Sequence, residues 1–233
     1  MNKLIAFIGA IAVAGMIAGC VTGGAGEDKV AKWQRERTPV EVLKSKIEVG
    51  AAAAAVEALD VAPFGIYKAV ADKVDKAAVL ERYRRIYMGY VGDVKGLEEQ
   101  GKSREEARKA VREQILKQPD GTQTVAKLNA YLKFAKESNF EAIEAWIKTM
   151  GEELKKAGEK LKEQSPIAME KLAAIAQNGD RIAAMRLAVK GRNDIAVIGA
   201  QLADAGKGLA LYVEMVNADK EAAKMQADYP VEG

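Results

Sequence analysis

The stretch at 141–164, "EAIEAWIKTMGEELKKAGEKLKEQ", carries the clearest periodic pattern in the chain. The heptad "GEELKKA" at 151–157 is followed directly by the similar heptad "GEKLKEQ" at 158–164. An apolar period of 3.5 residues is typical of a helix that lies along a partner helix. The pattern therefore predicts an all-α fold built from packed helices. The apolar residues recur in alternating steps of four and three: Ile143, Ile147, Met150, Leu154, Ala157 and Leu161.

Start and stop signals divide the rest of the chain into helices. Thr38-Pro39, Ser103, Ser138 and Ser165-Pro166 have the residue types of helix N-caps, with proline at the first helical position in two cases. Glycine-containing turns stand between them, at Gly101, 118–121, 178–180 and 191–194. The predicted helices are 39–59, 63–100, 103–117, 122–137, 139–164, 166–177, 180–190 and 194–227.

Apolar stripes like that of 141–164 also run along 63–100 and along 194–227. Three long helices with one apolar face each bury those faces by packing together. We therefore predict one domain over 38–233, an elongated antiparallel helical bundle with several shorter helices at one end. No strand is predicted, because alternation of β-branched or aromatic residues is scarce.

The N-terminus has the three parts of a secretory signal. Lys3 precedes an apolar run at 4–17, "LIAFIGAIAVAGMI", and small residues then lead to Cys20, the chain's one cysteine. The run is shorter than the ~20 residues that a helix needs to cross a bilayer. The sequence Ile17-Ala18-Gly19-Cys20 resembles the lipobox of bacterial lipoproteins.

The resemblance implies that a signal peptidase recognises Ile17, Ala18 and Gly19 and removes residues 1–19. It also implies that Cys20 receives a diacylglyceryl thioether and an acylated amino group, with palmitate as the typical chain. Val21 in place of aspartate resembles lipoproteins that are sent to the outer membrane. The expected location is the cell envelope, on the periplasmic face of the outer membrane if the host has two membranes.

The segment 20–37 is expected to be a short flexible tether followed by a charged juxtamembrane stretch. Within it an amphipathic tryptophan stands among basic residues, which is the composition of a segment that touches lipid headgroups. The predicted membrane-surface contacts are Trp33, Lys29, Lys32, Arg35 and Arg37.

The stretch "ERYRRIYMGY" at 81–90 permits two interpretations. Arginine offers paired donors to an anion and tyrosine offers flat amphipathic area, so the stretch could bind an anionic or glycan ligand. The alternative is a tyrosine seam inside the bundle with arginines at its edges. The candidate ligand-binding residues are Arg82, Tyr83, Arg85, Tyr87 and Tyr90.

Several kinds of chemistry are excluded by residue types that the sequence lacks. There is no histidine, and lipidation would consume Cys20, so imidazole metal sites, Ser-His-Asp triads and disulfides have no residues to form them. No glycine-rich phosphate loop is present. We therefore predict no cofactor, no metal and no enzymatic activity. The net charge of +3 gives no bulk attraction for nucleic acid.

Three functional hypotheses remain open. The first is a scaffold or accessory subunit that binds another cell-envelope protein, which an exposed apolar stripe on the folded bundle would favour. The second is a binder of a small anionic, glycan or peptidoglycan-derived ligand at the tyrosine and arginine residues. The third is peptidoglycan cleavage by Glu137, because Glu137-Ser138 is similar to a dipeptide of the lytic transglycosylases.

Overall fold

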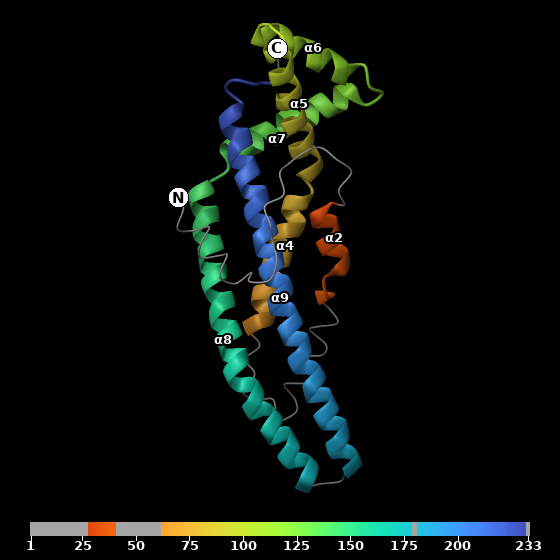
Figure 1. Ribbon diagram of the computed structural model, residues 1–233, viewed down its shortest axis with the longest axis vertical. Coiled ribbons are helices and arrows are strands. Elements are labelled where there is room, and N and C mark those ends of the chain that lie inside the picture. The colour runs from red at the N-terminus through yellow and green to blue at the C-terminus, as the bar shows by residue number, and fades with distance from the viewer. Residues whose placement is uncertain (1–27, 41–61, 179–180, 232–233) are drawn as a thin grey trace. The chain divides into compact units, whose positions relative to one another are not determined.

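The computed structural model describes residues 28–40, 62–178 and 181–231 (Figure 1). Within these ranges every regular element is an α-helix, so the predicted all-α helical bundle is confirmed. The predictions for Ile17, Ala18, Gly19 and Cys20, and for most of the helix at 39–59, lie outside the described residues. The helices are α2 (Lys29–Glu36), α4 (Ala62–Ala78), α5 (Glu81–Glu99), α6 (Arg104–Leu116), α7 (Gly121–Glu137), α8 (Phe140–Asn178) and α9 (Arg181–Met225).

The chain divides into two compact units. Unit 1 takes residues 1–74 and 145–211, and unit 2 takes residues 75–144 and 212–233. The division falls inside α4, α8 and α9, so each of these helices contributes one segment to each unit.

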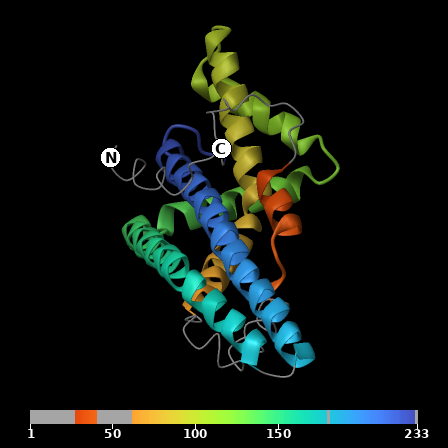
Figure 2. The same cartoon turned by 60° about the horizontal axis from the view of Figure 1, so that its bottom comes forward.

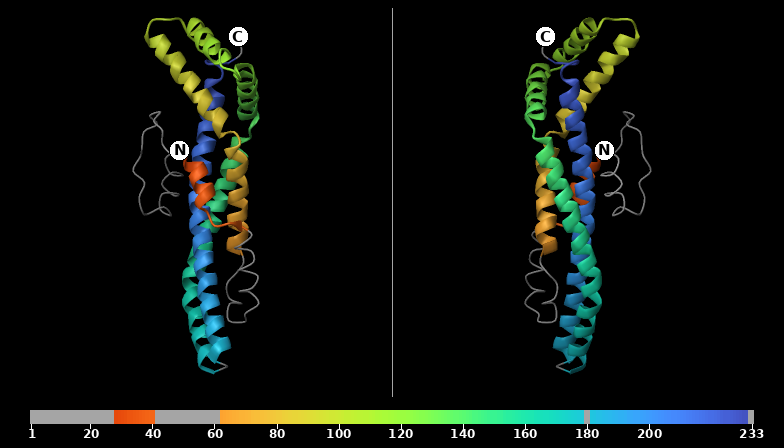
Figure 3. Two further views of the ribbon diagram at one scale, coloured as in Figure 1. Left: turned by 90° about the vertical axis from the view of Figure 1, so that its right-hand side faces the viewer. Right: turned by 90° about the vertical axis from the view of Figure 1, so that its left-hand side faces the viewer.

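In unit 1, α8 and α9 run antiparallel and side by side (Figures 2 and 3). A helix absent from our prediction, α2, packs against α9 in the same unit. The indole Nε1–H of Trp33 donates to the backbone oxygen of Asp204 at 3.1 Å, and the backbone N–H of Thr38 donates to the Asp204 carboxylate at 3.1 Å. Gly208 makes this approach feasible, because a Cβ on it would lie 2.6 Å from Cζ2 of Trp33 and 3.0 Å from Cγ1 of Val70.

In unit 2, α5, α6 and α7 pack with the last turns of α9 and with the C-terminal segment around a continuous apolar core. α5 and α7 contribute three tyrosine side chains to it, and the segment after α9 contributes Tyr229 and Val231. The core consists of Tyr87, Tyr90, Val91, Val94, Ala107, Val111, Ile115, Val125, Leu128, Tyr131, Leu132, Ala222, Tyr229 and Val231.

The connection between α5 and α6 ends one helix and starts the next as the sequence predicts. Gly101 has φ +90°, and the N–H groups of Gly101 and Lys102 donate back to the carbonyls of Glu98 and Leu97 at 2.9 and 3.1 Å. This is the Schellman arrangement, which needs a left-handed residue that glycine tolerates best. Ser103 then forms a complete capping box with Glu106.

The single helix predicted for 63–100 is wrong, because the structure has two helices, α4 and α5, separated at Val79 and Leu80. No glycine or proline marks this break. Leu80 packs against the core of unit 2 while Val79 is exposed, so tertiary packing sets the break.

The predicted breaks at Ser165-Pro166 and at 191–194 are also wrong, because α8 and α9 continue through them. The Ser165 hydroxyl donates backward to the Leu161 carbonyl at 2.5 Å, which is the bond of a serine inside a helix and not of an N-cap. Gly191 and Asp194 are both buried on the inner face of α9. Their burial in packed helices outweighs their weak helix propensity.

A similar correction applies at the start of α8. The hydroxyl of Ser138 donates to the carbonyl of Phe134 at 2.8 Å, and it is the Asn139 side chain that accepts from the N–H of Ala142 at 3.0 Å. Asn139 is therefore the capping residue, one position later than predicted.

Candidate functional site

The inner face of α9 carries the most informative polar residues of the fold. Its buried positions follow one another at steps of three and four, which is the spacing of a single helix face. Three polar side chains on it, Asp194, Gln201 and Asp219, are 3%, 0% and 7% exposed. The buried positions on this face include Gly191, Asp194, Ile198, Gln201, Ala205, Leu209, Tyr212, Val216, Asp219 and Ala222.

Asp219 forms a buried ion pair with Arg84 in unit 2. Arg84, only 3% exposed, donates from Nε to Oδ1 of Asp219 at 2.8 Å and from Nη2 to Oδ2 at 3.0 Å. Its Nη1 donates to Glu81, and the Tyr131 hydroxyl donates to Oδ1 of Asp219 at 2.7 Å. Arg84 thus uses all three guanidinium nitrogens, and the paired geometry is the strongest that arginine makes with a carboxylate.

The electrostatics of this cluster favour a structural role. Burial acts to lower the pKa of Arg84, but the hydrogen bond and the charge of Asp219 outweigh it, so the net shift is upward. The pKa of Tyr131 is raised well above the ordinary tyrosine range by burial and by the Asp219 charge. Both groups therefore hold their protons at neutral pH, and none of Arg84, Asp219 and Tyr131 is exposed. The arrangement fixes α5 and α7 to α9 and leaves no reacting atom open to a substrate.

The structure does not bring the predicted ligand-binding residues together as one open patch. Tyr87 and Tyr90 are buried with ring centroids 6.2 Å apart, and their hydroxyls donate to the backbone oxygens of Tyr229 and Pro230 at 3.2 and 2.9 Å. The burial of these two tyrosines agrees with the alternative of a tyrosine seam inside the bundle and leaves their rings no open face for a ligand.

The remaining residues of that prediction lie around the seam. Tyr83 is half-buried against the core, while Arg82 and Arg85 are exposed. Arg82 pairs with Asp120 at 3.3 Å, and Arg85 pairs with Glu81 at 3.0 Å.

Sequence reasoning missed Arg84, although a signal for it existed. Arg84, Tyr87, Val91 and Val94 follow one another at steps of three, four and three, which places Arg84 on the buried face of α5. Arg82 and Arg85 do not fall on that spacing. An arginine in register with core residues predicts a buried ion pair.

Trp33 cannot serve as the membrane-contacting aromatic that the sequence predicted, because its ring is buried against α9 and is only 6% exposed. The side chain of Arg37 lies over this ring, 4.7 Å from its centroid. Lys29, Lys32 and Arg35 are exposed on α2. These three basic side chains face solvent, and the tryptophan does not.

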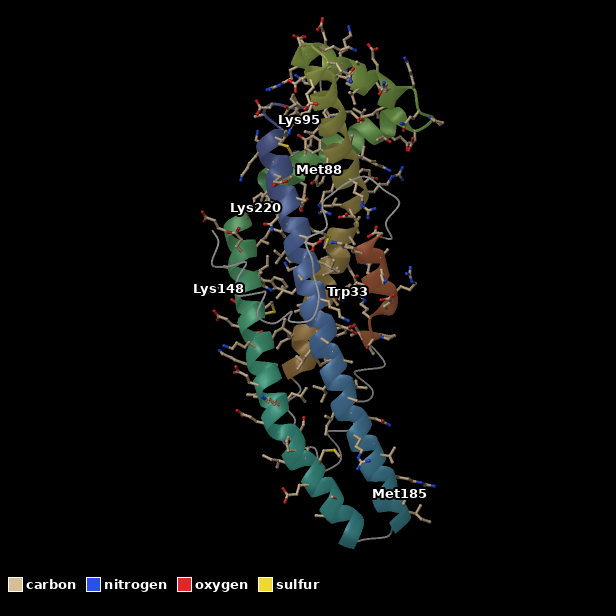
Figure 4. The ribbon with its side chains drawn as sticks, viewed as in Figure 1. Trp33, Met88, Lys95, Lys148, Met185 and Lys220 are labelled. Atoms are coloured by element: carbon tan, nitrogen blue, oxygen red, sulfur yellow. The ribbon has the colours of Figure 1, made fainter. Side chains whose placement is uncertain are left out.

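Unit 1 exposes an apolar face on the first turns of α9. Ile182, Met185 and Val189 are 66%, 67% and 54% exposed, and their spacing of three and four puts them on one side of the helix. Figure 4 shows the position of Met185 on these turns. Two exposed arginines, Arg186 and Arg192, share the same part of α9. We call Ile182, Met185, Val189, Arg186 and Arg192 the α9 face.

Unit 2 has a shallow hollow of about 350 Å³ between α7 and the C-terminal segment. Lys133 supplies its cation, and Gln226 has a buried Oε1 that accepts no hydrogen bond. The hollow is lined by Asn129, Ala130, Leu132, Lys133, Gln226, Pro230 and Val231.

Among the described residues, no group of three or more acidic, cysteine or histidine side chains is placed to hold a metal ion. None of the described helices combines the length and the apolar character that a membrane span requires. Comparison of the chain with protein-family models, with curated proteins and with solved structures found no match. The fold therefore defines the class, an all-α helical bundle, and the functional argument depends on the chain's own residues.

Proposed function

We propose that this chain is a lipid-anchored lipoprotein of the cell envelope that acts as a non-catalytic scaffold or accessory subunit for another envelope protein. The observation that carries the proposal is the exposed α9 face. Large apolar side chains grouped on one side of a helix, away from the core, are typical of a surface that a protein partner covers.

The anchor at Cys20 is the second part of the proposal. It is supported by the resemblance of Ile17-Ala18-Gly19-Cys20 to a lipobox. A thioether-linked diacylglycerol with a further acyl chain would attach the protein stably, since each buried CH₂ contributes about 0.8 kcal/mol. Attachment by lipid would keep the α9 face near the other proteins of the membrane surface and raise their effective concentration.

A non-catalytic role is supported by the state of the buried polar groups of unit 2. Arg84, Asp219 and Tyr131 satisfy one another and are closed to solvent. Glu137, the residue of the enzymatic hypothesis, is exposed at the last turn of α7. The Ser138 hydroxyl beside it donates to a backbone carbonyl of its own helix.

Photo-crosslinking in intact cells tests the scaffold. A photoreactive residue at Met185 should capture one envelope protein, and the same residue at Lys148, an exposed position of α8 in the same unit, should not. The variant Val189→Glu should abolish the capture from position 185 while the protein remains folded and anchored. Crosslinks only within the chain, or equal capture from positions 185 and 148, would contradict the proposal.

A second candidate function, binding of a small anionic ligand, is favoured by the hollow at Lys133. The Lys133 cation would bind a carboxylate of the ligand. Titration with soluble muropeptides, followed by NMR at the Asn129 and Gln226 side-chain amides, tests this candidate. Shifts that Lys133→Ala removes would support it, and unchanged spectra would eliminate it.

A further inference from the structure

The charge of the α9 face is one-sided. Arg186 lies four residues after Ile182 and three before Val189, and Arg192 lies three residues after Val189. These spacings place both guanidinium groups along the same side of the helix as the apolar side chains. Both arginines are exposed. The sequence of 180–192 carries Arg181, Arg186, Lys190 and Arg192 against Asp180.

An apolar stripe at steps of three and four is complementary to the apolar seam of another helix. Guanidinium groups beside that stripe pair with carboxylates more strongly than with neutral acceptors, and flanking charges decide which helices pair. We infer that the α9 face binds an amphipathic helix of the partner protein whose apolar seam is flanked by Asp or Glu. This inference rests on the scaffold function proposed above and names the chemistry of its partner.

Two other occupants fit the α9 face less well. A second copy would bring the same arginines against each other across a two-fold axis, which is repulsive. A lipid surface would attract the arginines, but helices that lie in a membrane interface typically carry Trp, Phe or Leu on their apolar side. No aromatic residue occurs between positions 147 and 211, and the face presents isoleucine, methionine and valine.

The two kinds of side chain should act on different rate constants. Charges at the edge of an interface mainly steer the encounter, so the arginines should set the association rate and its salt dependence. Apolar contacts at the centre hold the complex together, so Met185 and Val189 should set the dissociation rate.

The test uses two synthetic amphipathic helices with the same leucine seam, one flanked by glutamates and one by lysines. Binding to the full-length protein in detergent micelles is followed by biolayer interferometry. The glutamate helix should bind at least about tenfold more tightly than the lysine helix. The double variant Arg186→Glu/Arg192→Glu should slow its association about tenfold and flatten the salt dependence, while Val189→Ser should speed its dissociation.

The matched control is the double variant Lys148→Glu/Lys162→Glu, which reverses two exposed charges on α8 in the same unit. It should leave both rates within about twofold of the wild type. If it slows association as much as the arginine variant does, the effect comes from net charge and the inference is overturned.

Two further outcomes separate this inference from the scaffold proposal. Equal binding of both helices, lost in Val189→Ser, would overturn the acidic partner but leave the scaffold standing. An environment-sensitive fluorophore at position 185 that shifts to the blue in anionic vesicles, but not in neutral ones, would make lipid the occupant. In that case the inference about an acidic partner helix fails. The scaffold proposal is then tested separately, by photo-crosslinking from position 185 in intact cells.

Discussion

Two of the polar residues buried on the inner face of α9, Asp219 and Gln201, differ in their hydrogen bonding. In unit 2, Asp219 accepts hydrogen bonds from Arg84 and Tyr131. In unit 1, Gln201 is fully buried, and neither its Oε1 nor its Nε2 has a hydrogen-bond partner. Buried polar groups in folded proteins are nearly always bonded, so an orphaned amide needs a specific explanation.

The two units also differ in how they expose large apolar side chains. Unit 2 exposes large apolar side chains on separate elements, at Val79, Leu116 and Phe134, whereas unit 1 groups Ile182, Met185 and Val189 on one side of α9. Unit 2 satisfies the buried charges of Arg84 and Asp219 within the chain, and unit 1 retains the exposed apolar side chains of the α9 face. Under the scaffold function proposed above, unit 1 would supply the recognition surface.

Spectroscopy can follow the two units separately. Both tryptophans, Trp33 and Trp146, belong to unit 1, and every tyrosine except Tyr67 belongs to unit 2. Tryptophan fluorescence therefore reports on unit 1, and the tyrosine region of the near-ultraviolet circular dichroism spectrum reports mainly on unit 2.

The largest effect should come from breaking the buried ion pair. The substitution Arg84→Ala leaves the Asp219 carboxylate buried without its cation, and removal of one member of such a pair typically costs about 3–5 kcal/mol. Urea unfolding followed by the tyrosine signal should show this loss. The control Arg82→Ala removes an exposed arginine paired with Asp120 and should cost less than about 1 kcal/mol. Equal losses in the two variants would show that the cluster does not stabilise unit 2.

A smaller effect is expected at the contact between α2 and α9 in unit 1. The substitution Gly208→Ala would place a Cβ 2.6 Å from the Trp33 ring, and overpacking of this kind typically costs about 1–3 kcal/mol. The control Gly206→Ala meets no atom within 4 Å and should instead stabilise by up to about 1 kcal/mol through helix propensity. Tryptophan-detected thermal unfolding measures both changes. A stabilising Gly208→Ala would show that α2 does not pack as described.

The helical class and the inward stripes were predictable from the sequence because periodicity is a local signal. Ile147, Leu154 and Ala157 are buried as the heptads predict, and the Gly101-Ser103 connection follows its local capping chemistry. The errors in the predicted helix boundaries occur where tertiary packing determines whether a helix ends or continues. The break at Leu80 before α5 contains no glycine or proline, and α8 continues through Pro166.

The candidate sites show the same division between local and non-local information. The spacing of Tyr87 and Tyr90 predicted a shared face, but only the core around them shows that this face points inward. The basic residues around Trp33 predict a membrane contact. The Trp33 ring is instead buried against α9, where Gly208, far along the chain, leaves space for it. The exposure of Met185 depends on what packs nearby, and no local pattern reveals it.

Gln201 gives a prediction of opposite sign to most core substitutions. Replacement by leucine, which has a similar volume, removes two buried polar atoms that make no hydrogen bonds, so Gln201→Leu should stabilise unit 1 by about 1 kcal/mol or more. Tryptophan-detected urea unfolding is the measurement. The control Gln123→Leu changes an exposed residue of α7 and should shift stability by less than about 0.5 kcal/mol. Destabilisation by Gln201→Leu would mean that its amide is bonded in solution, and the contrast with Asp219 would then disappear.

The smallest predicted effect per residue is an alkaline weakening of unit 2. Burial raises the pKa of Tyr87, Tyr90 and Tyr131 above the ordinary value of about 10, so these hydroxyls stay protonated in the folded protein while the unfolded chain ionises. Their protonated hydroxyls therefore contribute to the stability of unit 2 below pH 10, and this contribution is lost as the pH rises above 10. For each of these tyrosines, the free energy of unfolding falls by about 0.8 kcal/mol between pH 9 and pH 10.5.

The substitution Tyr131→Phe isolates one of these contributions. Loss of its hydrogen bond to Asp219 lowers stability by a similar amount at every pH in this range, whereas loss of the ionisable group makes the pH dependence shallower by about 0.8 kcal/mol between pH 9 and pH 10.5. Urea unfolding at the two pH values, detected by circular dichroism, gives the difference directly. A variant with the wild-type slope would mean that Tyr131 ionises equally in the folded and unfolded chains, and hence that the cluster around Asp219 is open to solvent like the α9 face.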